Sequence, residues 1–129
     1  MASGIALLAL GALLSACGGS QDAAVADLAD EFYGAVGDGD GAAACALLAP
    51  ATRSELEQSS GKKCAAAILE ELSDARRDED EVEVFGSMAE VRWRGVTVFL
   101  TRMPDGWRVL AAGCVPRRVG PHDCAVKGA

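Results

Sequence analysis

The chain has 129 residues, a length that suits one domain. Its 19 Asp and Glu residues outnumber its 12 Lys and Arg residues, and the resulting net charge of −7 argues against a nucleic-acid partner. Only 5% of the residues are aromatic, so we expect a small core built mainly from Val, Leu and Ile. Five Cys residues in so short a chain indicate an oxidising compartment.

The first sixteen residues are similar to a secretion signal. Residues 5–14 are apolar throughout, but a membrane-spanning helix needs about 20 such residues. The run ends in Leu14-Ser15-Ala16-Cys17, which resembles the lipobox of bacterial lipoproteins. This resemblance implies a signal peptide over residues 1–16, cleavage before Cys17, and lipid on its thiol. The protein would then be anchored to the extracytoplasmic face of the cell membrane.

The segment after the signal predicts a tether and then helices. Residues 17–21 comprise the lipidated Cys and a Gly- and Ser-rich flexible tether, and residues 22–129 form one domain. Apolar residues at helical spacing predict a helix over residues 22–36. We expect Asp40 to cap a second, Ala-rich helix that ends at Pro50. A third helix is expected to begin at a capping box formed by Thr52 and Glu55.

A longer helix and then a sheet are predicted for the rest of the domain. The helix spans residues 62–77 and points Cys64, Ile68, Leu69 and Leu72 inward. From Glu81 the apolar residues alternate with polar ones, which is typical of strands. Turn sequences divide this region into four antiparallel strands. The predicted class is therefore α+β, with N-terminal helices packed on a curved four-stranded antiparallel sheet.

If Cys17 carries lipid, four Cys residues remain and allow three pairings. We favour disulfides Cys45–Cys64 and Cys114–Cys124, which would fasten two helices together and hold the C-terminal tail against the last strand. A zinc site or a redox dithiol is the rival interpretation. The chain has one His and no C-x-x-C pair, so we expect no metal and no cofactor.

Three stretches resemble a group of small actinobacterial lipoproteins with a nuclear transport factor 2-like domain. They are the lipobox, the segment from Cys45-x-Leu47-Leu48-x-Pro50 to Gly61-x-x-Cys64, and the segment from Gly106-Trp107 through Cys114 to Pro121-His122-Asp123-Cys124. The resemblance implies a cone-shaped α+β fold in which helices cap a curved sheet. It brings no catalytic residues, because related cones include dehydratases and isomerases as well as non-catalytic domains.

Few residues in the domain suggest chemistry. The only His, His122, lies in a Pro-flanked loop, and residues 38–41 fit a turn and helix cap better than a calcium loop. Arg92 and Arg94 either pair with Glu81 or Glu83 or form a basic face for an anionic partner. A pocket inside the cone would be lined by aromatic residues, which otherwise form plain core: Phe32, Tyr33, Trp93, Phe99 and Trp107.

These patterns favour a lipid-anchored binding or accessory domain over an enzyme. We expect it to contact the membrane through Cys17 and, beyond that, a membrane or envelope protein. The alternative is a small cone-fold isomerase or dehydratase acting on an apolar substrate. That alternative requires a titratable side chain inside the cone, and the sequence names no carboxylate for the role.

Overall fold

The computed structural model describes residues 19–128, in which four helices precede a five-stranded antiparallel sheet. The helices are α1 (Gly19–Gly37), α2 (Gly41–Ala46), α3 (Pro50–Ser60) and α4 (Cys64–Glu71). The strands are β1 (Glu81–Phe85), β2 (Met88–Trp93), β3 (Val96–Met103), β4 (Gly106–Val115) and β5 (Asp123–Val126). The predicted α+β class is confirmed, whereas the predicted number of strands was wrong.

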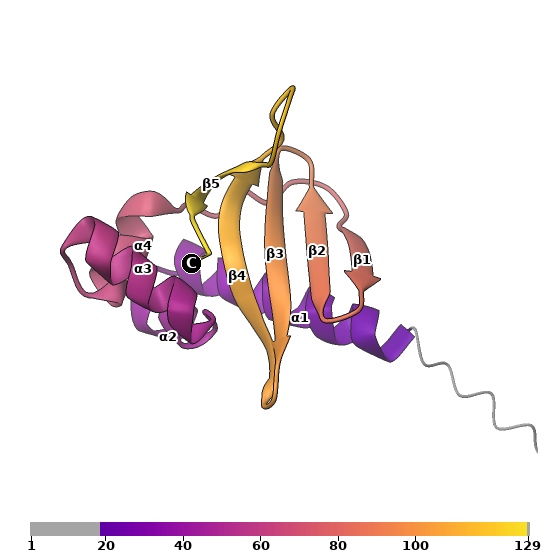
Figure 1. The fold of residues 1–129 in the computed structure, drawn as a ribbon, viewed down its shortest axis with the longest axis horizontal. Coiled ribbons are helices and arrows are strands. Elements are labelled where there is room, and N and C mark those ends of the chain that lie inside the picture. Colours follow the sequence, from indigo (N-terminus) through magenta and orange to yellow (C-terminus); the bar gives the residue numbers. More distant parts are fainter. Residues whose placement is uncertain (1–18, 129) are drawn as a thin grey trace, which may run out of the picture.

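The strands lie side by side in chain order, and each pairs antiparallel with the next. Helix α1 crosses one face of this sheet, while α2, α3 and α4 gather beyond β5 (Figure 1). We call the face packed on α1 the helix-covered face; it carries Val91, Val98, Leu100 and Val109. The opposite face is the open face; it carries Glu90, Arg92 and Phe99.

The helical period of the first segment predicted α1 well. Its fully or nearly fully buried residues recur every three or four positions and face the sheet: Val25, Ala29, Phe32, Tyr33 and Val36. The helix begins at Gly19, however, so residues 19–21 form its first turn and not a tether. The domain therefore begins two residues after Cys17.

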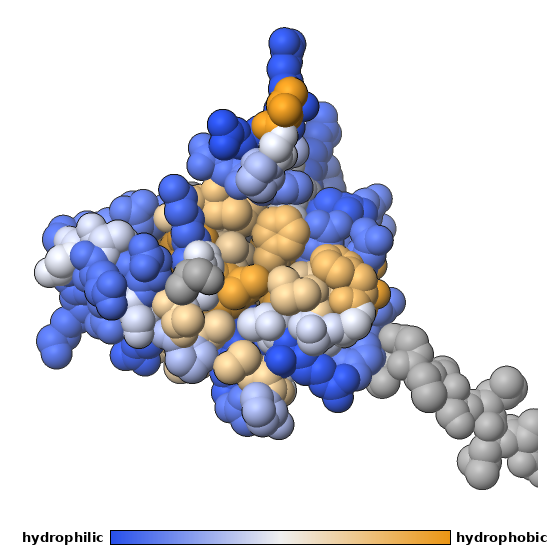
Figure 2. All heavy atoms as spheres, in the orientation of Figure 1, coloured by the Kyte–Doolittle hydropathy of each residue, from blue (hydrophilic) through white to orange (hydrophobic). Residues whose placement is uncertain are grey.

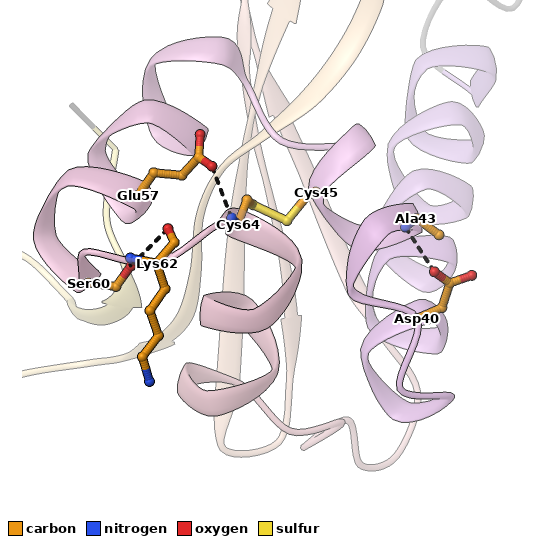
Figure 3. Close-up of a disulfide and its surroundings, with 7 residues drawn as sticks. All are labelled: Asp40, Ala43, Cys45, Glu57, Ser60, Lys62 and Cys64. Carbon is orange, nitrogen blue, oxygen red and sulfur yellow. Dashed lines mark hydrogen bonds between the residues drawn. A yellow bond between two sulfur atoms is a disulfide. The ribbon is translucent and has the colours of Figure 1, made fainter.

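Helix α2 is capped as predicted, because the Asp40 side chain accepts a hydrogen bond from the Ala43 N–H at 3.1 Å (Figure 3). The predicted boundaries of α3 were wrong. Pro50 does not end α2; it is the first residue of α3, where its missing N–H costs nothing. Thr52 lies inside that helix, fully buried, and its hydroxyl donates to the carbonyl of Leu110 at 2.8 Å.

Helix α4 has eight residues and stops well before the predicted end at residue 77. Leu72 is already extended and still buried, whereas Leu69, predicted to point inward, is 37% exposed. In the segment that follows the helix, Arg76 fastens the chain to α1. Its guanidinium contacts Asp74 at 2.7 Å and Asp30 at 3.0 Å.

Strand β5 escaped prediction because it is short and buries only Val126 completely. It pairs with the end of β4, where Cys114 lies opposite Cys124. Within that part of β4, Gly113 adopts a positive φ of 63°. A Cβ at this position would lie 2.7 Å from Leu72 Cδ2, so both conformation and space favour glycine there.

Candidate functional site

Three of the predicted pocket-lining residues meet on the helix-covered face, where they form packed core. Phe32 and Tyr33 are fully buried and meet edge to face, with ring centroids 5.3 Å apart. Tyr33 meets Trp93 in the same way at 5.4 Å. Edge-to-face pairs at this separation stabilise a core beyond the burial of their area. These three rings occupy the space in which a pocket was anticipated.

The other two predicted lining residues lie apart from this cluster. Trp107 is buried, and its indole N–H donates to the Gln21 side chain at 2.9 Å. Phe99 was misplaced by the prediction: it projects from the open face and meets His122 edge to face at 5.2 Å. Its neighbours Val98 and Leu100 occupy the helix-covered face instead, as the alternation along a strand requires. His122 is half-buried in the predicted loop.

Tyr33 carries the only titratable group of the aromatic cluster, and its hydroxyl is hydrogen-bonded to the sheet. The phenolic oxygen accepts a hydrogen bond from the Gly113 N–H at 2.9 Å. Burial raises the pKa of Tyr33 to about 12, because the phenolate would lose its hydration. The phenol therefore stays protonated at neutral pH. Its position indicates a structural tie between α1 and β4.

Among residues 21–128, whose burial the structure describes, no charged residue is buried, and the buried polar residues are Thr52 and Thr97. The charged side chains that act on Tyr33 are those of the Asp74–Arg76 pair. Hydrogen bonds from Arg76 hold the pKa of Asp74 below its usual range, and the carboxylate in turn raises the pKa of Arg76. This pair stays charged and fastens the segment after α4 to α1.

A pocket of about 260 Å³ does occur elsewhere in the described residues, between α3, the end of α4 and β5. It lies among polar side chains, away from the predicted aromatic lining. The residues around it are Glu55, Leu56, Ser59, Glu71, Ala125 and Lys127. Sequence reasoning missed it because β5, which supplies Ala125 and leads directly into Lys127, was not predicted.

Both favoured disulfides are present. Cys45 joins Cys64, and Cys114 joins Cys124. The first links the end of α2 to the start of α4, where the Glu57 carboxylate also accepts a hydrogen bond from the Cys64 N–H at 3.1 Å (Figure 3). The three short helices are thereby fastened into one unit beside the sheet.

The acidic loops do not gather into a cation site. Over the described range, no three His, Cys, Asp or Glu side chains are placed to hold a metal ion together. Asp40 acts as the predicted helix cap. The acidic residues of β1 and β2 instead surround Arg92, which contacts Glu81 at 3.3 Å, Glu83 at 3.4 Å and also Glu90.

The arginines that the sequence placed on a basic face are thus largely paired. Arg94 lies 3.8 Å from Asp78, and Arg108 lies 2.6 Å from Asp105. The pairing across the β1–β2 hairpin confirms the first of the two interpretations offered for Arg92. Between these charges, apolar side chains are visible over the middle of the open face (Figure 2).

Cys17, the predicted lipidation site, lies outside the described residues. Among the helices of residues 19–128, none is long and apolar enough to cross a membrane. The chain matches no protein-family model, no curated protein and no solved structure.

Proposed function

We propose that this chain is a lipoprotein whose domain serves as a non-catalytic binding or accessory module on the extracytoplasmic face of the cell membrane. The lipid would be carried by Cys17, at the end of the lipobox-like sequence. The two disulfides support an oxidising compartment, because such bonds persist outside the reducing cytosol. With Cys17 acylated, all four remaining Cys residues are paired.

The observation that carries the non-catalytic part is the packing of Tyr33. An enzyme of the kind considered would need a titratable group facing an open interior. Tyr33 is instead fully buried between Phe32 and Trp93, and its hydroxyl is bonded to Gly113. Its raised pKa of about 12 also makes it a poor general base at neutral pH.

We further propose that the domain is related to the nuclear transport factor 2-like cones. The order of elements supports this idea, since a long first helix crosses an antiparallel sheet and short helices follow it (Figure 1). In this proposal the domain acts through its surface on a protein of the membrane or envelope, because its interior is filled. Cross-linking in native membranes, followed by purification of the chain, would identify such a partner.

The anchoring part is tested by Cys17→Ser in the full-length chain. Wild-type protein should sediment with membranes and partition into detergent, whereas the variant should be unprocessed or released. Ser15→Thr, which keeps a small residue before the cleavage site, is the matched control and should behave like wild type. A Cys17→Ser protein that still carries lipid and still partitions into detergent would contradict the proposal.

A further inference from the structure

The β1–β2 and β3–β4 turns form one end of the sheet, because the strands between them are antiparallel. The backbone N–H of Arg102 joins the two turns by donating to the carbonyl of Ser87 at 2.8 Å. The first turn of α1 reaches the same end, where Gln21 accepts the hydrogen bond from Trp107. Figure 1 shows this end of the sheet beside the N-terminal part of α1.

Apolar side chains are exposed at this end. Phe85 is 49% exposed, and its register partner Met88 is half-buried. Met103 is half-buried on the next hairpin, and Pro104 is exposed at its tip. A single exposed apolar residue is ordinary, but four exposed or half-buried ones on two neighbouring turns form a group that is a candidate for contact with another apolar phase.

The position of the proposed lipid anchor indicates that the apolar phase is the membrane. Only Gly18 separates Cys17 from Gly19, the first residue of α1. Two fully extended residues span about 7 Å, so acyl chains on Cys17 would hold the start of α1 at the membrane surface. The domain has no long tether on which it could stand away from the lipid.

We propose that this end of the sheet, with Phe85, Met88 and Met103, lies in the headgroup and upper acyl region of the membrane that holds the anchor. The inference rests on the proposed acylation of Cys17. Exposed Arg102, the register partner of Trp107, adds a cation at the same end, and cations there favour anionic headgroups. Apolar side chains and the lipid anchor then act together on a single surface.

Val119 provides an internal comparison. It is 85% exposed, more than Phe85, but it follows the far end of β4 in the loop that leads to β5. In Figure 1 that loop projects from the end of the sheet opposite the β3–β4 turn. If exposed apolar surface alone decided membrane contact, both Phe85 and Val119 would contact lipid. The position of the anchor predicts that only Phe85 does.

The test uses the full-length chain, isolated with its lipid and reconstituted in vesicles of phosphatidylglycerol and phosphatidylethanolamine. A photoreactive benzoylphenylalanine replaces Phe85 in one variant and Val119 in another. After irradiation, mass spectrometry counts lipid adducts at each position and reads the mass of the Cys17 peptide in the same sample. We expect acylated Cys17 and several-fold more lipid adduct at position 85 than at position 119.

The outcomes separate this inference from the proposed function. If Cys17 is acylated but position 85 yields no more lipid adduct than position 119, the membrane contact is wrong and the anchoring stands. Cross-linked dimers in place of lipid adducts at position 85 would assign this end to a second copy and also overturn the inference. An unmodified Cys17 would overturn the proposed function and, with it, the contact that depends on the anchor.

Discussion

The phenolic oxygen of Tyr33 accepts a hydrogen bond from the backbone N–H of Gly113 at 2.9 Å. This bond joins the middle of α1 to the irregular part of β4, where the positive φ of Gly113 interrupts the regular ladder. A buried N–H that loses its ladder partner needs another acceptor. Tyr33 supplies that acceptor, so a side chain of α1 takes the place of the missing hydrogen-bond partner in the sheet.

Tyr33→Phe should therefore destabilise the domain although the ring remains. The partly buried N–H of Gly113 would lose its partner, at a cost of about 1–3 kcal/mol. Urea unfolding should show a lower midpoint with an unchanged m value. A variant as stable as the wild type would mean that the bond does not contribute to folding.

The ionisation of Tyr33 can be measured directly, because the chain has a single Tyr. Ultraviolet absorbance of the folded protein should report a pKa of about 12, raised by burial from the usual value of 10.0. In guanidinium the midpoint should return to the ordinary range. A folded-state midpoint equal to the denatured one would show that the phenol is solvated.

The same shift gives stability a defined pH dependence. The folded state retains the phenolic proton above pH 10.0, where the unfolded chain releases it, so the unfolded chain binds fewer protons. This contribution is fully present below pH 10.0 and is lost as pH rises to about 12, by about 3 kcal/mol in total. Tyr33→Phe should lack this part of the alkaline decline.

Gly41 and Gly34 make a matched pair of helical glycines. A Cβ on Gly41 would overlap the backbone carbonyl of Ala65, whereas a Cβ on Gly34 would meet nothing within 4 Å. Gly41→Ala should cost about 1–3 kcal/mol through overpacking. Gly34→Ala should add about 0.5–1 kcal/mol, because alanine restricts the unfolded chain. Equal effects of the two substitutions in urea unfolding would contradict the close packing of α2 on α4.

Thr52 tests whether the sheet depends on α3. Thr52→Val keeps the shape but leaves the carbonyl of Leu110 without its 2.8 Å donor, at a cost of about 1–3 kcal/mol. Thr52→Ser keeps the hydroxyl and removes one methyl, so it should cost less. The order of the two unfolding midpoints is the measurement, and a Val variant more stable than the Ser variant would refute the role of this bond.

Local signals predicted the regular elements. Helix α1 and the strands from Val82 to Val109 each bury one face. Their apolar residues therefore recur at a regular spacing that can be recognised in the sequence. Setting Cys17 aside for lipid left four Cys residues and three possible pairings, and the favoured pairing is the one present. Even the misplacement of Phe99 was avoidable, because alternation with Val98 and Leu100 already placed it on the open face.

The features that were not predicted depend on contacts between residues far apart in the sequence. The segment after α4 is held by Arg76, which reaches Asp30, 46 residues away, and no local pattern encodes that contact. Thr52 resembled a helix cap, but its hydroxyl bonds to a residue 58 positions later. Strand β5 likewise depends on its pairing with β4. Its four residues show only a weak alternation of apolar and polar side chains.

We propose that Cys17 is an acylated N-terminus that lies only two residues before the start of helix α1. The most direct test is mass spectrometry of the N-terminal peptide of the protein isolated from membranes. We expect a peptide that begins at Cys17 and carries the mass of two or three acyl chains. A peptide that runs through residues 1–16 into an unmodified Cys17 would contradict it.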